Sequence, residues 1–235
     1  MKKCLFIIAV LSLLYACCKS EKKNEVKPKT PKGAVDLGIV ITREDGTTYT
    51  LYWAESNLSE SGLCARPEDC GDYYAWGETA AKSDYSWSTY KWVDASVSLT
   101  KYNTDISIGV KDNKTALDPE DDVARAKLGG KWRMPTDAEW TALREQCEWK
   151  WTGNYNGTAR GRIVTGPNGN SIFLPTAGYR GDTSLKDTDS YGGYWSSSLS
   201  TEDPNSAFSN AFGFDDVYRE SGYRYYGQSV RPVSE

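Results

Sequence analysis

The sequence contains no histidine, and only three of its six cysteines lie beyond residue 18. The absence of histidine excludes His general bases, Ser-His-Asp and Cys-His catalysis, and every His metal ligand. The chain also has no excess of basic residues, because its formal net charge is −4. That charge excludes a generally basic, nucleic-acid-binding protein.

Residues 1–16 are predicted to be a lipoprotein signal peptide. Two lysines give the start a positive charge, and residues 5–14 form an apolar run too short to span a bilayer well. The run ends in Leu-Tyr-Ala-Cys, which resembles the lipobox of bacterial lipoproteins with Cys17 as the lipidated residue. The alternative is an ordinary secretory signal. Cleavage before Cys17 would leave a surface-exposed chain, lipid-anchored to the outer membrane.

Residues 17–32 are predicted to be the lipid-anchored basic tether. Residues 19–32 hold six Lys, two Glu and two Pro but no aromatic residue, so they have little apolar area to bury. Together with the two lysines near the start, the tether leaves a net charge of −10 for residues 33–235. These residues are expected to form one acidic domain. A basic stalk suits an anionic membrane surface, and a soluble spacer is the alternative.

The remaining cysteines do not form a metal-binding pattern. Cys64 and Cys70 are candidates for a small disulfide loop in an exported protein. A zinc site is not expected, because their spacing is not Cys-x-x-Cys and no other ligand cluster accompanies them. Cys147 lies on the apolar face of an expected helix and is predicted to pack as a small hydrophobe.

The local patterns are mostly those of β-strands. Two hairpins are expected, one over residues 35–41 and 47–53 and one over residues 162–165 and 171–174, because β-branched or aromatic runs flank turn sequences. Further short strands are expected at the following positions: residues 194–198, 207–214 and 229–233.

Two helices interrupt this pattern. Residues 119–128 are expected to form one helix, capped by Asp118, with Pro at its first position and Gly129 as its end. A capping box at residues 136–139 starts the second, where apolar residues recur at helical spacing. The predicted fold class is α+β, a twisted, loop-rich antiparallel sheet with two helices.

Several motifs resemble the Fibrobacter succinogenes major paralogous domain, a family common in Bacteroidales lipoproteins. They are GDYYAWGE (residues 71–78), GGKWRMPTDAEW (129–140), NGNSIFLP (168–175), YWSSS (194–198) and GQSVRPV (227–233). The resemblance covers about residues 33–235. It implies a C-type-lectin-like fold, similar to formylglycine-generating enzymes and to the variable proteins that diversity-generating retroelements rewrite. In those variable proteins a C-terminal surface patch differs from copy to copy, which implies surface ligand binding.

The C-terminal region has the composition of a binding surface. Residues 191–226 contain six Tyr, with Ser, Gly, Asn and Asp filling most of the gaps, as in antibody paratopes. Aromatic faces can also stack on sugars. Trp195, Phe212 and Phe214 are assigned to the core, and Arg231 is expected to pair internally with an acid. The candidate ligand-binding residues are Tyr191, Tyr194, Phe208, Asn210, Asp216, Tyr218, Tyr223, Tyr225 and Tyr226.

Enzymatic and metal-dependent alternatives lack support in the sequence. No cysteine follows Cys147, whereas formylglycine-generating oxidases need a reactive pair near the C-terminus. Two Ser-x-x-Lys matches, at residues 88–91 and 98–101, lie in expected loops and lack a Lys-Thr-Gly companion. The acidic residues at 118–122 fit a helix start better than a calcium loop, and residues 203–205 (Asp-Pro-Asn) fit a proline turn better than a calcium or sugar ligand.

The sequence therefore predicts a non-enzymatic lipoprotein, without cofactor or metal, that binds an extracellular protein or glycan through its Tyr-rich C-terminal face. Its membrane contact would be the lipid anchor. The alternatives are a structural or accessory subunit of a surface fibre and, third, an enzyme of the formylglycine-generating fold. The residue types do not distinguish a protein ligand from a glycan.

Overall fold

The computed structural model describes residues 30–235. The expected signal peptide (1–16), Cys17 and all but the last three residues of the tether (17–32) lie outside the described residues. The described part is mostly antiparallel β-structure with two α-helices and long loops, as the coarse α+β prediction states. None of its helices is both long enough and apolar enough to cross a bilayer.

The strands are short, and 3-10 turns occur in the loops. The strands are β1 (Ala34–Thr42), β2 (Thr48–Ala54), β3 (Leu58–Ser59), β4 (Gly62–Leu63), β5 (Glu148–Tyr155), β6 (Ala159–Thr165), β7 (Ser171–Pro175), β8 (Tyr179–Gly181), β9 (Ser184–Lys186), β10 (Gly192–Leu199), β11 (Ser206–Phe212), β12 (Val217–Tyr223) and β13 (Val233–Ser234). The helices are α1 (Val123–Leu128) and α2 (Asp137–Gln146), and the 3-10 turns are η1 (Trp87–Thr89), η2 (Ile106–Ile108) and η3 (Pro119–Asp121).

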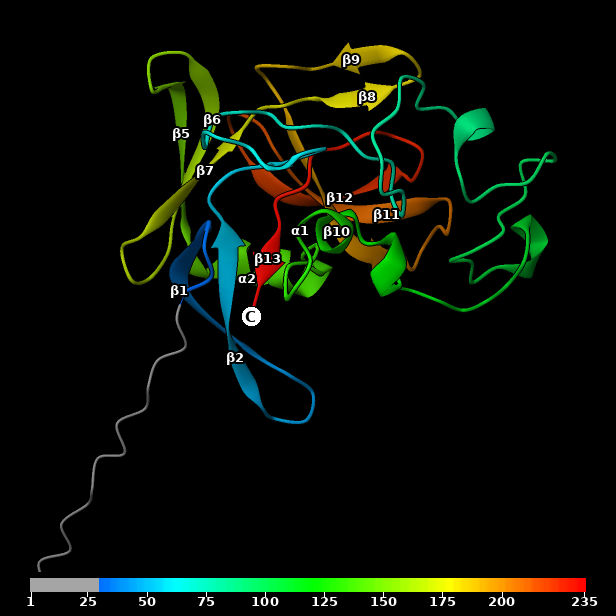
Figure 1. Ribbon diagram of the computed structural model, residues 1–235, viewed down its shortest axis with the longest axis horizontal. Coiled ribbons are helices and arrows are strands. Elements are labelled where there is room, and N and C mark those ends of the chain that lie inside the picture. Colours follow the sequence, from blue (N-terminus) through cyan, green and yellow to red (C-terminus); the bar gives the residue numbers. More distant parts are fainter. Residues whose placement is uncertain (1–29) are drawn as a thin grey trace, which may run out of the picture.

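The strands form several small sheets rather than the one twisted sheet expected from the sequence. Their orders are β1-β2-β13, β5-β6-β7 and β10-β11-β12, with two-stranded ladders β3-β4 and β8-β9. Figure 1 shows the red C-terminal β13 beside the blue N-terminal hairpin, so both ends of the described chain meet in one sheet. The loops before α1, in teal and green, extend to the right of the sheets.

Both predicted hairpins are confirmed. β1 pairs with β2 around a turn in which Asp45 Oδ1 accepts the Thr47 N–H at 2.9 Å, and β6 pairs with β7 around residues 166–170. The expected strand at 229–233 is wrong over most of its length, because only its last residue lies in β13. Arg231 is buried there as expected, but it donates to Asn57 Oδ1 and to the carbonyls of Ala54 and Phe173 instead of to an acid.

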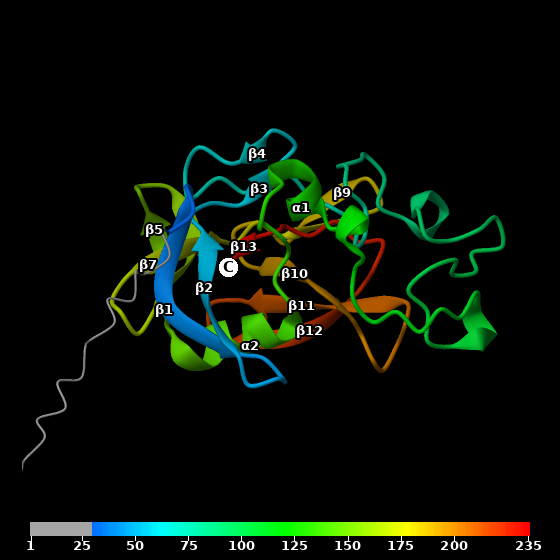
Figure 2. The same ribbon diagram turned by 60° about the horizontal axis from the view of Figure 1, so that its bottom comes forward.

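The capping box predicted at residues 136–139 is present. Thr136 Oγ1 accepts the Glu139 N–H, and the Glu139 carboxylate accepts the Thr136 N–H at 2.8 Å. The helix α2 that follows contacts β1, β10, β11 and β12 (Figure 2), and it inserts Trp140 and Leu143 into the main core with Trp53. The predicted motif therefore anchors the N-terminal sheet to the sheet that carries the C-terminal region.

The helix expected over residues 119–128 is divided in two. η3 ends at Asp121, and Asp122 adopts an extended backbone conformation, so a new helix, α1, starts at Val123. The cap is Asp122 rather than Asp118, because the Asp122 carboxylate accepts the N–H groups of Arg125 and of Met134. The second contact fixes α1 to the segment before α2.

The core predictions are confirmed for Trp195 and Phe212, which are fully buried, and wrong for Phe214. β11 ends at Phe212, so Phe214 falls in the turn before β12 with 66% of its surface exposed and its ring edge-on to Trp151. Cys147 ends α2 and packs, partly buried, against the core as expected, and burial raises the pKa of its thiol to about 11.

Cys64 and Cys70 are free thiols, so the candidate disulfide is not formed in the structure. Their backbones are fixed separately by Asn57, whose carbonyl accepts the Cys64 N–H and whose Nδ2 donates to the Cys70 carbonyl, each at 2.9 Å. Between them, Arg66 and Asp69 close the loop with a hydrogen bond of 2.6 Å. The loop is thus held by side-chain and backbone hydrogen bonds.

Candidate functional site

A pocket of about 570 Å³ lies where β8, β12 and the chain after β12 converge. Its walls come from segments far apart in the sequence: the β8-β9 hairpin, the two loops on either side of β10, and the C-terminal segment. The lining residues are Tyr179, Asp187, Tyr191, Asp203, Ser206, Glu220, Ser221, Gly222, Tyr223, Tyr226 and Gln228. The C-terminal region that the sequence singled out therefore does form a concave surface.

A continuous row of aromatic rings contributes four of its members to the lining of this pocket. Tyr191 meets Tyr179 edge-on at 5.9 Å, and Tyr179 meets Tyr226 at 5.3 Å. Tyr226 in turn contacts both Tyr223 and Tyr225, and Tyr225 lies 4.8 Å from Trp87. These six rings are called the aromatic belt below. Their mutual contacts fix the ring orientations, which gives the pocket a rigid apolar wall.

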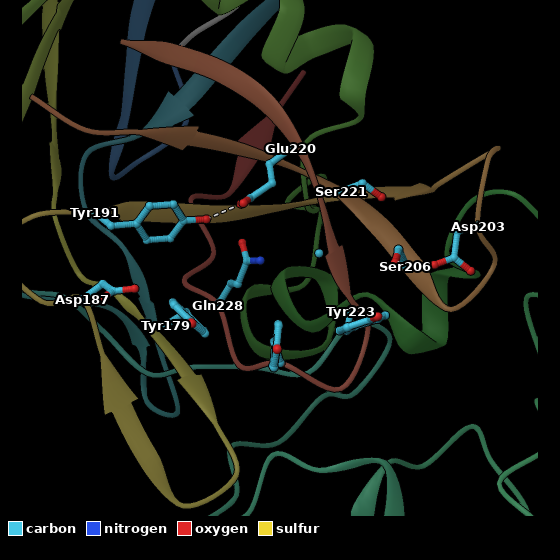
Figure 3. Close-up of a pocket in the computed structure, with 11 residues that line it drawn as sticks. Tyr179, Asp187, Tyr191, Asp203, Ser206, Glu220, Ser221, Tyr223 and Gln228 are labelled. Atoms are coloured by element: carbon cyan, nitrogen blue, oxygen red, sulfur yellow. Dashed lines mark hydrogen bonds between the residues drawn. The ribbon is translucent and has the colours of Figure 1, made fainter. Parts of the chain in front are cut away.

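The side chains of Tyr191 and Glu220 point toward each other and meet in the pocket lining (Figure 3). The Tyr191 hydroxyl donates a hydrogen bond to Glu220 Oε2, while Oε1 has no hydrogen-bond partner within residues 30–235. Burial and the Glu220 charge raise the pKa of Tyr191 well above its ordinary value, so the phenol keeps its proton and remains the donor. The second carboxylate oxygen is thus free to accept from a bound molecule.

Gln228 lies beneath this pair and directs its carboxamide toward it (Figure 3). Its side chain is only 2% exposed, yet its Oε1 has no partner among the described residues. A Cβ on Gly222 would lie 2.9 Å from Gln228 Nε2, and one on Gly193 would lie 3.1 Å from Oε1. Glycine at these two positions therefore leaves the space that the Gln228 carboxamide occupies. Gln228 Oε1 is a buried acceptor that a ligand with an N–H or O–H group could satisfy.

The three carboxylates of the pocket have no cationic partner. Asp187 has no side-chain hydrogen bond within residues 30–235, and Asp203 accepts only from Asn205 and from the Ser206 hydroxyl. None of the ion pairs in the described part of the chain includes Asp187, Asp203 or Glu220. No Lys or Arg lines the pocket, so its lining carries three uncompensated acidic groups.

The structure brings together only part of the predicted binding set. Tyr191, Tyr223 and Tyr226 line the pocket, and Tyr225 supports their rings from behind. Asp216 and Tyr218 are exposed but lie outside the pocket lining, at the start of β12. The Tyr-rich face is thus narrower than the sequence suggested.

Three predicted binding residues, Tyr194, Phe208 and Asn210, are buried instead of facing solvent. Tyr194 is fully buried against Phe212, with its hydroxyl on the Pro175 carbonyl at 2.7 Å. Phe208 lies under the Arg219 guanidinium, and Asn210 Oδ1 accepts from Arg144 at 2.9 Å. All three side chains are buried in β10 and β11, so the structure does not present them to a ligand on the surface.

Sequence reasoning missed most of the polar lining. Gln228 was part of the motif that carried the family resemblance, but a motif does not show which side chain faces a pocket. Glu220 lies between two exposed positions of an amphipathic strand, and Tyr179 lies in a strand of only three residues. The sequence predicts a proline turn at residues 203–205 in preference to a ligand site. Asp203 makes that turn and also lines the pocket.

A cluster of acidic residues at 118–121 has ligand-type spacing, with carboxylate oxygens of Asp118, Glu120 and Asp121 within 4.8 Å of one another. The ammonium of Lys101 occupies the cluster, at 2.6 Å from both Asp118 and Asp121. Although burial opposes it, hydrogen bonds from Lys101 and Tyr102 hold the pKa of Asp121 below its ordinary value. Lys101 is therefore an internal counter-ion.

Because a lysine already neutralises this cluster, a chelator is expected to leave the melting temperature of the purified protein within about 1 °C of its untreated value. Differential scanning calorimetry with and without EDTA checks this expectation. A fall of several degrees that added calcium restores would show that a cation stabilises the fold.

Comparison of the chain with protein-family models, with curated proteins and with solved structures found no match.

Proposed function

We propose that the chain is a lipid-anchored envelope or surface lipoprotein that binds an extracellular protein or glycan non-covalently through the pocket described above. In this proposal residues 33–235 are a Fibrobacter succinogenes major paralogous domain with a C-type-lectin-like fold. The motifs quoted from the sequence support the family, and antiparallel sheets with two helices and long loops are compatible with that fold.

The observation that carries the proposal is the convergence of the aromatic belt with unpaired polar groups in one pocket. Rigid tyrosines offer contact area at low cost in conformational entropy, and neighbouring carboxylates and amides provide orientation. The site offers binding groups without a histidine, and its tyrosine hydroxyl is used to hold Glu220. Recognition therefore accounts for the pocket better than bond-making chemistry does.

Two tyrosines of β12 provide a matched test. Tyr223 is 47% exposed and lines the pocket, whereas Tyr218 is 40% exposed and does not. The purified full-length protein is screened on glycan and peptide arrays beside Tyr223→Ala and Tyr218→Ala. Signals are expected to be lost in Tyr223→Ala and kept in Tyr218→Ala, with both melting temperatures within a few degrees of wild type, because exposed rings add little to stability.

Equal loss in both variants would move the site from the pocket to the open face of β12. Silence of the folded wild-type protein on every array, and on intact cells of neighbouring species, would count against recognition. It would favour the alternative of a structural or accessory subunit of a surface fibre.

The lipid anchor is tested separately. Cys17→Ser removes the thiol that would be acylated, so the variant is expected in the soluble fraction while the wild type sediments with membranes. Cys18→Ser is the matched control, because it changes the adjacent cysteine outside the lipobox. Membrane retention of Cys17→Ser would contradict the lipobox assignment.

A further inference from the structure

We propose that the pocket recognises a cationic group, an ammonium or guanidinium, carried by a basic peptide side chain or an amino sugar. This inference rests on the proposed function and specifies the chemistry of the ligand. It comes from three features of the pocket: its unpaired carboxylates, its aromatic belt and the buried acceptor of Gln228.

The first feature is charge. Asp187, Asp203 and Glu220 line one cavity without an ion pair to any described residue. By contrast, the acidic cluster at residues 118–121 is neutralised internally, because Lys101 pairs with both Asp118 and Asp121. Like charges around one cavity repel each other, and a bound cation would relieve that repulsion. The pocket is therefore complementary to positive charge.

The second feature is the geometry of the acceptors. Glu220 Oε1 is free because Tyr191 occupies Oε2, and Gln228 Oε1 beneath it is buried without a donor. Both atoms accept hydrogen bonds and neither can donate. A group with several N–H donors, such as an ammonium or guanidinium, satisfies them together, whereas an anionic ligand would add repulsion.

The third feature is the aromatic belt. Tyrosine faces attract cations through their quadrupoles, and this attraction increases where water is excluded. Tyr179, Tyr223 and Tyr226 present rings to the same cavity that holds the carboxylates. The alkyl stem of a lysine or the ring of an amino sugar can lie against these rings while its cationic group reaches Glu220.

A lysine of the protein lies next to the aromatic belt, and its removal tests whether the ligand is positively charged. Lys186 is opposite Tyr179 in the β8-β9 hairpin, and it forms no ion pair within residues 30–235. Its Nζ and Tyr226 Cε1 both lie 3.3 Å from where a Cβ on Gly181 would be. A cationic ligand would be repelled by this ammonium, so Lys186→Met is expected to strengthen binding.

The experiment uses two pairs of probes in which N-acetylation removes the positive charge, titrated calorimetrically into the full-length protein. One pair is terminally blocked trilysine and its Nε-acetylated form, and the other is the trimer of glucosamine and that of N-acetylglucosamine. The charged member of at least one pair is expected to bind, more weakly at high salt, and its uncharged partner is not. The pair that responds identifies the source as peptide or amino sugar.

Four variants locate the effect. Glu220→Gln keeps an acceptor for Tyr191 but removes the charge, and it is expected to weaken binding about tenfold. Asp216→Asn removes one charge outside the pocket and is expected to leave affinity nearly unchanged. Gln228→Met removes an unsatisfied acceptor, so it should weaken binding while keeping or raising the melting temperature. Lys186→Met should strengthen binding of the charged probe.

Equal affinity for charged and uncharged probes, lost in Tyr223→Ala, would overturn the cationic inference and leave ligand binding by ring stacking in place. If Asp216→Asn and Glu220→Gln weaken binding equally, affinity depends on the net charge of the protein and not on the pocket, which would overturn the inference. If neither charged probe binds while the arrays give Tyr223-dependent signals, the inference fails and the proposed function stands. If the arrays are silent as well, both fail.

Discussion

Replacement of Arg224 by alanine is expected to lower the free energy of unfolding by about 3–5 kcal/mol and the melting temperature by about 10 °C. Its guanidinium is fully buried and has no carboxylate partner. Nε donates to the Tyr90 hydroxyl at 2.9 Å, and the two terminal nitrogens donate to the carbonyls of Lys101, Tyr102 and Pro204 at 2.9–3.0 Å. Alanine would leave these four acceptors buried and unpaired.

The matched control is Arg219→Ala, because Arg219 is half exposed and makes one surface ion pair, 3.4 Å from Asp137. It is expected to cost less than about 1 kcal/mol. Arg224 also connects the loop at Pro204, next to the pocket residue Asp203, to the end of β12. Chemical denaturation of both variants checks the prediction, and similar midpoints for the two would contradict the role given to Arg224.

Replacement of Glu139 by glutamine is expected to destabilise the protein by about 3 kcal/mol near neutral pH. The carboxylate is 1% exposed and accepts from both terminal nitrogens of Arg133, at 2.6 and 2.7 Å, and from the Tyr49 hydroxyl at 2.7 Å. An amide would turn N–H groups toward Arg133 and leave its charge uncompensated. Glu145→Gln, an exposed change on the same helix, is the control and is expected to be nearly neutral.

The ion pair between Glu139 and Arg133 also makes the stability of the protein depend on pH. Burial opposes ionisation, but hydrogen bonds and charge from Arg133 outweigh it and hold the pKa of Glu139 below its ordinary value of 4.5. A carboxyl with a lowered pKa in the folded state contributes stability above its unfolded pKa, and that contribution is lost as the pH falls through the folded value. The difference in stability between wild type and Glu139→Gln should therefore shrink as the pH is lowered below about 4.5. A constant difference down to strongly acidic pH would contradict this assignment.

The parts of the fold predicted well are those specified by neighbouring residues. The hairpins over β1-β2 and β6-β7 follow from strand-forming runs on either side of turn residues, and α2 follows from a capping box and apolar spacing. Errors occur where a distant contact competes with local preference. Asp122 divides the helix expected at 119–128 because its carboxylate also binds the Met134 N–H.

The predicted ligand-binding residues show the same contrast between local patterns and distant contacts. Composition identified residues 191–226 as rich in tyrosine, and three of those tyrosines line the pocket. Alternation along a strand does not show which face meets another layer, so the sequence predicts Tyr194 on the surface although Trp140 and Phe212 cover it. The same pattern predicts Phe214 in the core, although β11 ends two residues before it.

The sequence by itself determined the absence of histidine chemistry, the acidic charge of residues 33–235, the hairpins and the capped helix, because each depends on composition or on residues close together in the chain. Only the tertiary structure decided that Tyr179, Glu220 and Gln228 line one cavity with Tyr191. Their proximity depends on how β8, β12 and the C-terminal segment pack, and on glycines at 193 and 222 that leave room for the carboxamide of Gln228. Such contacts join residues up to about fifty positions apart, over distances at which local sequence patterns carry no information.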